Sequence, residues 1–272
     1  AIISSMIYEC YAPLYDTSGQ IRFALLVAVY LRELLARHPV GGQRMLDLAC
    51  GTGTLAISQA SEGWHVVGID SAPAMIAQAE AKLSGAALAG SACFMCGDMR
   101  RVAELLPPNG FDLVTCTYDS LNYMTNAADL LACFTSAAYA LVPGGLYVGD
   151  MNTRHFLEFE WGAYAVREQD GFVQIEQSHF DPQLAMSTMV LTGFVGDDVA
   201  GYERFDEVHV ERAYPSKLVR KLIERAGLHV EACYDSFTAS PPGPYTQRIF
   251  WVARKPAEAQ YAAPLQDTMT TP

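Results

Sequence analysis

Three aspartates lie in or directly after strands that the sequence predicts, and their side chains could hold a polar ligand. Asp47 lies within MLDLA, Asp70 ends VVGID, and Asp98 follows ACFMCG. A carboxylate accepts hydrogen bonds from hydroxyl and amine groups, and the carboxyl ends of parallel strands meet at one edge of a sheet. The three acids therefore predict a ligand-binding site at that edge.

The turn after the first of these strands contains two glycines and can be interpreted in two ways. From Gly51 to Ala56 it fits G-x-G-x-x-[GA], the dinucleotide-binding pattern. From Asp47 it is an acid followed by small residues at alternate positions, Ala49, Gly51 and Gly53, as in proteins that hold S-adenosylmethionine. Glycine lets the chain bend and a ligand approach, and the next helix presents free N–H groups. The glycines alone do not distinguish the two ligands.

The acids favour S-adenosylmethionine over NAD. Asp70 could accept both ribose hydroxyls of either ligand. Asp98 and the backbone N–H of Met99 suit the edge of an adenine, and a dinucleotide fold has no comparable requirement at this position. Asp47 would be unfavourable beside a pyrophosphate but suits an ammonium group. We therefore expect a methyl donor, with an NAD-dependent oxidoreductase as the alternative enzyme.

Alternating strand and helix patterns surround these residues. A helix at 22–37 is followed by strands at 44–49, 64–70, 92–98, 111–118 and 144–152 and helices at 53–62, 72–83 and 127–141. This alternation predicts an α/β fold with a mostly parallel sheet that is doubly wound by right-handed crossovers. Three β-rich runs, a helix and two strands follow at 171–180, 185–196, 202–214, 216–227, 228–237 and 245–255.

These elements divide the chain into five segments. They are an N-terminal helical cap (1–43), a cofactor-binding core (44–158), a small antiparallel β insertion that could act as a lid (159–214), the C-terminal part of the core (215–255) and a tail (256–272). The tail is rich in Ala, Thr and Pro, and we expect it to be poorly ordered.

Several motifs, in their order and spacing, resemble a class I S-adenosylmethionine-dependent methyltransferase from about Tyr8 to Lys255. The motifs are YAPLYD, LDLACGTGT, VVGID, GDMR, FDLVTCTYDSLNYM, ALVPGGLYVGDMNT and RIFWVARK. The chain is most similar to small-molecule enzymes with a β insertion after strand five, such as amino-sugar and glycine N-methyltransferases. DSLNYM, ERAY and RIFWVARK also resemble a bacterial subgroup whose substrates are mostly unassigned. The resemblance implies a Rossmann-like sheet of seven strands with an antiparallel last strand.

The resemblance also implies the contacts of the cofactor. Residues of the first turn would frame the methionine end, Asp70 and its neighbour would hold the ribose, and residues after the third and fourth strands would contact the adenine and the sulfonium. The implied cofactor-binding residues are Tyr15, Asp47, Ala49, Cys50, Gly51, Gly53, Asp70, Ser71, Met75, Asp98, Met99 and Cys116. Tyr15 matches a position that closes over the methyl group in the amino-sugar enzymes. Ala49 departs from the family, which usually has glycine there.

The methyl acceptor needs its own contacts. A neutral amine can attack directly, whereas a hydroxyl or an acidic carbon usually needs a base. The candidate catalytic residues are Tyr15, Tyr123 and His155, and the candidate acceptor contacts are Asn122, Tyr123 and Arg154. The sequence leaves nitrogen and oxygen acceptors open.

Other reactive side chains have simpler interpretations. His179 and His209 lie in the β insertion. They would line a substrate pocket if the insertion is a lid, but we expect them on solvated strand faces. Cys93 and Cys96 form a C-x-x-C, but a zinc site needs two further ligands and a redox pair lies at a helix N-terminus. We predict that both cysteines pack in the core and that the chain has no metal site.

Composition narrows the partners and the location. Eighteen basic and 30 acidic side chains give a net charge of −12, which disfavours nucleic acid. The apolar stretch at 23–31 is too short to span a bilayer, and no signal peptide is recognised. Seven scattered cysteines suit a reduced, cytoplasmic protein. We expect a small-molecule acceptor, S-adenosylhomocysteine as product and no membrane partner. A homodimer is compatible with the sequence, and a non-catalytic cofactor-binding module on the same fold is a further alternative.

Overall fold

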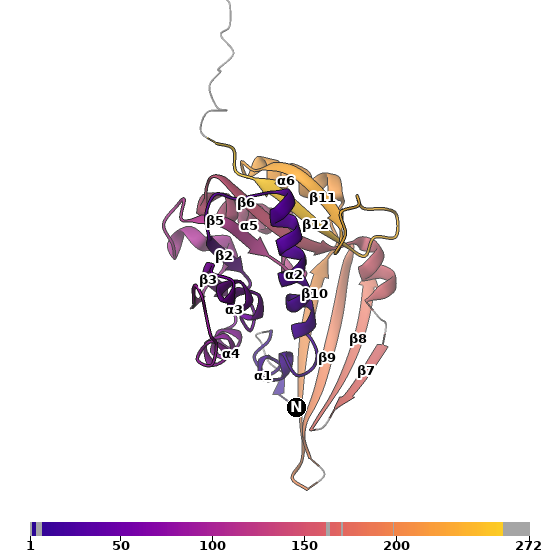
Figure 1. Ribbon diagram of the computed structural model, residues 1–272. Coiled ribbons are helices and arrows are strands. Elements are labelled where there is room, and N and C mark those ends of the chain that lie inside the picture. Colours follow the sequence, from indigo (N-terminus) through magenta and orange to yellow (C-terminus); the bar gives the residue numbers. More distant parts are fainter. Residues whose placement is uncertain (1, 4–6, 162–163, 170, 198, 258–272) are drawn as a thin grey trace, which may run out of the picture.

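Two β-sheets organise the computed structural model, which describes residues 2–3, 7–161, 164–169, 171–197 and 199–257 (Figure 1). One sheet has seven strands and the other has five. The predicted tail lies outside the described residues from position 258 onward. Within the described residues, every helix falls short of the length and apolar character that a membrane crossing requires.

The seven-stranded sheet confirms the predicted α/β fold. In sequence order its strands are β2 (Arg44–Leu48), β3 (His65–Asp70), β4 (Ser91–Cys96), β5 (Phe111–Cys116), β6 (Leu141–Asn152), β11 (His229–Asp235) and β12 (Arg248–Arg254). Their spatial order is β11-β12-β6-β5-β2-β3-β4. The last strand, β12, is antiparallel to both of its neighbours, while β2 to β6 pair in parallel. The order reverses between β2 and β5, where open α/β sheets bind their ligands.

Helices cover both faces of this sheet because its strand residues alternate between two cores. Met45, Leu113 and Val148 face one core, with α2 (Ile21–Arg37) and α3 (Thr54–Ser61). Their neighbours Leu46, Val114 and Tyr147 face the other core. The remaining helices are α1 (Ala12–Tyr15), α4 (Pro73–Leu83), α5 (Ala127–Ala140), α6 (Ser216–Arg225) and the short η1 (Met99–Glu104), η2 (Ser120–Tyr123) and η3 (Phe156–Glu160).

Four strands of the five-stranded sheet follow the fifth strand of the core and one comes from the N-terminal segment, so the sheet contains more strands than we predicted. Its strands, in spatial order, are β1 (Ile2–Ile3), β10 (Gly201–Arg212), β9 (Met186–Asp197), β8 (Phe172–Asp181) and β7 (Tyr164–Gln169). The sequence did not indicate β7 because its side chains are mostly exposed and lack an apolar alternation. In Figure 1 the long strands run beside α1, whose segment packs tyrosines against them.

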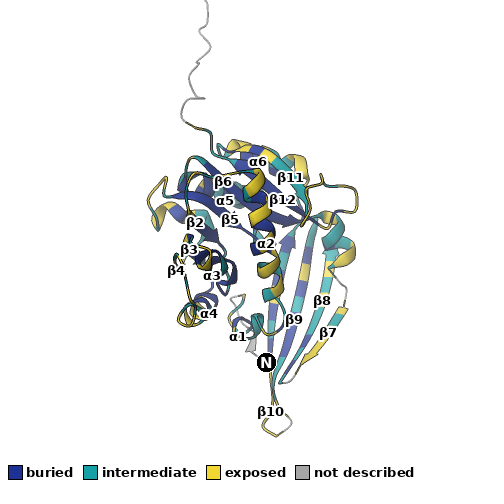
Figure 2. Cartoon of the chain, in the orientation of Figure 1, coloured by how far each residue is buried: buried dark blue, intermediate teal, exposed yellow. Residues whose placement is uncertain are grey.

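From Glu207 onward, strand β10 buries its acidic and histidine side chains rather than its valines, which is the reverse of the usual pattern. Glu207, His209 and Glu211 are buried at alternate positions, whereas Val208 between them is 47% exposed. Figure 2 shows that β10 is exposed near the hairpin, at residues 201–204, and more buried toward its other end. The predicted solvated position of His209 is therefore wrong, while His179 on β8 is exposed as expected.

The cysteine pair also departs from the prediction. Cys93 and Cys96 are both exposed rather than packed in the core. They lie on β4, which is an edge strand of the seven-stranded sheet and, in the part of the chain that the structure describes, pairs with β3 alone. One side of β4 therefore meets solvent, which an apolar sequence run does not reveal.

Candidate functional site

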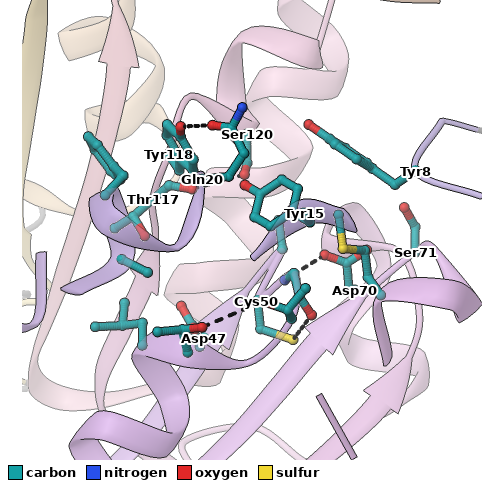
Figure 3. Close-up of a pocket in the computed structure, with 18 of the residues that line it drawn as sticks. Tyr8, Tyr15, Gln20, Asp47, Cys50, Asp70, Ser71, Thr117, Tyr118 and Ser120 are labelled. Carbon is teal, nitrogen blue, oxygen red and sulfur yellow. Dashed lines mark hydrogen bonds between the residues drawn. The ribbon is translucent and has the colours of Figure 1, made fainter. Parts of the chain in front are cut away.

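A cavity, here called the first cavity, lies at the carboxyl ends of β2, β3 and β5 where the strand order reverses (Figure 3). Its empty volume, which includes space open to solvent, is about 940 Å³. The turn after β2 forms its floor, and residues of α1, α2 and the segment after β5 form its other walls. It is therefore located where the three predicted acids were expected to meet a ligand.

Asp70 closes one side of the first cavity and organises the turn. Its carboxylate accepts the N–H of Gly51 and the N–H of Ala72, each at 2.9 Å. An ionised carboxylate offers about four lone-pair positions, so about two remain for a ligand. Burial raises the pKa of Asp70, and the backbone bonds from Ala72 and Gly51 act in the opposite direction.

Asp47 lies deeper and is only 2% exposed. Its Oδ1 accepts the Thr115 hydroxyl at 2.6 Å. Burial raises the pKa of Asp47 to about 7, the Thr115 bond lowers it, and the charge of Asp70 raises it further. Among the described residues, no basic side chain forms an ion pair with Asp47. A cationic ligand group would therefore find an acid that is poised to ionise.

The two glycines of the turn serve different purposes. Gly51 has φ +55°, and among the described residues, its two chain neighbours aside, no heavy atom lies within 4 Å of the position that a Cβ would occupy. Gly53 has φ +72°, and a Cβ there would lie 2.5 Å from the ring of Phe94. Gly51 thus leaves room for a ligand, whereas Gly53 lets the turn pack against β4. Ala49 also has a positive φ, +54°, a conformation that favours glycine.

Comparisons with known proteins agree with this geometry. A family model described as a methyltransferase domain matches residues 45–145. YqeM of Bacillus subtilis, named as a candidate methyltransferase, is 28% identical over 250 residues, which are 92% of this chain and 98% of YqeM. A solved S-adenosylmethionine-dependent methyltransferase from Clostridium acetobutylicum superposes with a TM-score of 0.78 at 26% identity, covering 93% of this chain and 100% of that one. The chain is a class I S-adenosylmethionine-dependent methyltransferase.

A further relative of this methyltransferase has a named substrate. It is the dTDP-3-amino-3,4,6-trideoxy-α-D-glucopyranose N,N-dimethyltransferase of Streptomyces venezuelae, 27% identical over 203 residues, which are 74% of this chain and 81% of that enzyme. These relatives leave the NAD-dependent alternative without support. The first cavity also suits the cofactor. It combines Asp47, a buried acid that forms no ion pair with the described residues, with Asp70, whose carboxylate has lone pairs to spare, and Gly51, beside which a ligand has room.

Most of the predicted cofactor-binding residues of the methyltransferase line the first cavity. They are Tyr15, Asp47, Ala49, Cys50, Gly51, Asp70, Ser71, Met75 and Met99. Three others do not line it. Gly53 packs on Phe94, and Cys116 is buried with its Sγ 3.7 Å from Met99 Sδ.

Asp98 is the third predicted residue outside the first cavity. Its carboxylate pairs with the Arg100 guanidinium and accepts the Arg100 N–H at 2.8 Å. The Arg100 hydrogen bond lowers the pKa of Asp98. In this structure the side chain therefore acts as the cap of η1 rather than facing the cavity where Met99 lies.

The predicted acceptor residues separate into two groups. Tyr15 and Tyr123 line the first cavity. Asn122 is fully buried and its amide donates to the Asn152 and Arg212 carbonyls, so it joins segments of the chain instead of facing an acceptor. Arg154 and His155 line a different hollow beside α6, and the structure therefore does not bring them to the methyl-transfer site.

A second cavity lies between the core and the five-stranded sheet, with an empty volume of about 720 Å³. It shares five lining residues with the first cavity, which we call the tyrosine wall: Tyr8, Tyr15, Gln20, Tyr118 and Tyr123. Figure 3 shows Tyr15 between Tyr118 and Tyr8, and the ring centroids are 6.5 and 5.9 Å apart.

The sequence assigns none of several residues of the second cavity to a site, apart from His209, which it indicates as a pocket residue only in case the insertion is a lid. They include Tyr8, Trp161, Met189, His209, Glu211 and Arg248. The available signal was the alternation of polar residues with Val208 and Val210, which places the acids and the histidine of β10 on one face. Only the fold shows that this polar face points inward.

Proposed function

We propose that the first cavity holds S-adenosylmethionine in the orientation that the resemblance implies. Asp70 would accept the ribose hydroxyls, Asp47 would lie near the methionine ammonium, and Gly51 would admit the ligand to the backbone. When bound, the cofactor supplies a methyl group on a positively charged sulfur, which a nucleophile takes by in-line displacement. The protein mainly contributes alignment and an electrostatic field.

Binding of S-adenosylhomocysteine, which keeps the ammonium group, should depend on pH through Asp47. The pKa of this acid is about 7 in the ligand-free protein, and a bound ammonium group should lower it because opposite charges favour ionisation. Below pH 7 a proton must therefore leave on binding, and affinity should weaken by up to about tenfold per pH unit. Calorimetry in buffers of different ionisation enthalpy measures this proton release.

The Asp47→Asn variant provides the control for that titration. It should bind more weakly than the parent at pH 8 and lose the proton release near pH 6.5. Equal proton release by both proteins would assign the pH dependence to another group.

We further propose that the methyl acceptor binds in the second cavity. The observation that carries this proposal is the tyrosine wall, because residues that line both cavities mark where the two ligands can meet. The second cavity is lined by hydroxyl, carboxylate and aromatic groups, and such groups can orient a polar small molecule. We therefore propose transfer to a nitrogen or oxygen of a small molecule. The named amino-sugar substrate of the Streptomyces venezuelae relative supports this class.

Filling the second cavity should abolish turnover without affecting the cofactor. Met189 lines that cavity and not the first, so Met189→Trp should lower turnover by more than tenfold while the affinity for S-adenosylhomocysteine stays unchanged. Thr188, its exposed neighbour on the opposite face of β9, supplies the control Thr188→Trp, which should remain active.

The assay measures S-adenosylhomocysteine formed from S-adenosylmethionine in the presence of a panel of amines and hydroxyl compounds. Turnover by Met189→Trp equal to that of the parent would place the acceptor elsewhere. Binding of the cofactor with no transfer to any acceptor would instead support the non-catalytic module.

We also propose a cytoplasmic location and no nucleic-acid partner. All seven cysteines are free thiols in the structure, which suits a reducing compartment. The net charge of −12 opposes binding to a phosphate backbone.

A further inference from the structure

A chain of hydrogen-bonding side chains connects the tyrosine wall to the five-stranded sheet. The Tyr8 and Tyr123 hydroxyl oxygens are 2.9 Å apart, and the Tyr123 hydroxyl is 2.9 Å from Nδ1 of His209. Nε2 of His209 lies 3.5 Å from Oε2 of Glu207. The connected groups are therefore, in order, the Glu207 carboxylate, the His209 imidazole and the Tyr123 phenol. Tyr123 lines both cavities.

The surroundings of Glu207 determine the state of the imidazole. Glu207 is 1% exposed and its carboxylate accepts the backbone N–H groups of Tyr8, Cys10 and Tyr11. Burial would raise the pKa of Glu207, but His209 and these three N–H groups hold it below its usual value. An ionised carboxylate beside Nε2 favours the tautomer with its proton on Nε2. Nδ1 is then free to accept the Tyr123 hydroxyl proton.

Among the described residues, the His209 ring has few possible hydrogen-bond partners other than Tyr123 and Glu207. It is 2% exposed, and Nε2 has no hydrogen bond among the described residues, so Glu207 is the acceptor nearest to that proton. Burial and the charges of Glu211 and Asp119 raise the pKa of Tyr123 well above its ordinary value. A tyrosine in this setting cannot lose a proton alone, but it can receive one proton while it passes its own to a neighbour.

We propose that Tyr123 and His209 form a relay that removes the proton of the methyl acceptor. The relay rests on the proposed function, because it requires an acceptor in the second cavity. The acceptor lone pair forms the new bond to the methyl carbon, and the electrons of the broken carbon–sulfur bond stay on sulfur. The acceptor proton moves to the Tyr123 oxygen, the Tyr123 proton moves to Nδ1 of His209, and Glu207 stabilises the imidazolium. His209 acts through Tyr123 and is a positioning residue.

The tautomer of His209 tests the relay without any acceptor. Nitrogen-15 NMR of the full-length protein, labelled at histidine and saturated with S-adenosylhomocysteine, should show a neutral His209 with its proton on Nε2 and Nδ1 as an acceptor. Tyr123→Phe should shift the Nδ1 resonance, because it removes the donor. A proton on Nδ1 in the parent protein would overturn the relay, since that nitrogen could not then accept a proton.

Kinetics test whether the relay is used. His209→Gln keeps a hydrogen-bond acceptor for Tyr123 but cannot take up a proton at neutral pH, so kcat should fall on the order of 100-fold or more. KM for S-adenosylmethionine and the affinity for S-adenosylhomocysteine should not change. Tyr123→Phe should show a similar loss, and the double variant should fall no further, because both belong to one path. The control His179→Gln alters an exposed histidine of the same sheet and should leave kcat unchanged.

The outcomes separate the relay from the proposed function. A parent enzyme that methylates an acceptor, together with an equally active His209→Gln variant, would overturn the relay alone. Multiplicative losses in the double variant would also contradict it. A parent enzyme that methylates no acceptor would overturn the proposed function and, with it, the relay.

Discussion

Replacing Arg248 by methionine should lower the free energy of unfolding by about 3–5 kcal/mol, the range for breaking a buried ion pair from one side. Arg248 is 8% exposed and its guanidinium binds the carboxylates of Asp119 and Asp150, while it stacks over the ring of Phe23 with 4.5 Å to the centroid. Asp150 is fully buried and also accepts the N–H groups of Tyr118 and Asp119. Methionine would replace the apolar stem but leave the buried Asp150 and the half-buried Asp119 without a cation.

Chemical denaturation of both proteins measures this change. The matched control is Arg101→Met, which breaks an exposed pair with Glu104 and should cost no more than about 1 kcal/mol. Adding Asp119→Asn to Arg248→Met should recover part of the loss, because one uncompensated acid is removed. Additive losses in that double variant would show that the two side chains are not energetically coupled.

Gly53→Ala should mainly lower the stability of the protein, whereas Gly51→Ala should mainly lower its affinity for the cofactor. Gly53→Ala should cost about 2–5 kcal/mol of stability, since the left-handed backbone costs about 1–2 kcal/mol and overlap with Phe94 about 1–3 kcal/mol. Gly51→Ala meets no neighbouring atom, so only the backbone cost of about 1–2 kcal/mol applies. Its new methyl group would instead occupy the first cavity, and affinity for S-adenosylhomocysteine should fall on the order of tenfold or more.

Denaturation and calorimetry on the two variants separate these effects. Each glycine is the control for the other, because both have positive φ and lie two residues apart in one turn. A Gly51→Ala protein with parental affinity would show that the ligand does not approach the backbone there. A Gly53→Ala protein with parental stability would show that Phe94 moves aside at little cost.

The core fold was predictable because local patterns determine it. Alternating strands and helices, glycines at the turn and an acid at the end of the second strand are signals that neighbouring residues carry. Asp47, Gly51 and Asp70 accordingly meet in the first cavity. Asp98 shows the limit of such signals, since the sequence does not reveal that Arg100 two residues later engages its carboxylate.

The second cavity could not be predicted, because its residues come from segments that no local pattern connects. Tyr8, Tyr123 and His209 belong to the N-terminal segment, to η2 and to β10. A strand in which valines alternate with charged residues normally exposes the charged face. On β10 the charged face is buried because Glu207 binds the N-terminal backbone and Glu211 receives the Asn152 amide. These partners are known only once the chain is folded.

The hydrogen bonds between the Glu207 carboxylate and the N-terminal backbone affect the order in which the chain can fold. Tyr8 and Glu207 are 199 residues apart in the chain, and contacts of such large sequence separation form slowly because a long loop must close first. The β2–α3–β3 unit, by contrast, closes through short connections. During synthesis β2 to β6 can therefore form before β10 leaves the ribosome, and the hydrogen bonds that fix the Tyr8 end of the tyrosine wall form only after β10 has been made. A chain that ends before β10 would present the cofactor turn to solvent without the completed wall, so we expect such a chain not to transfer a methyl group.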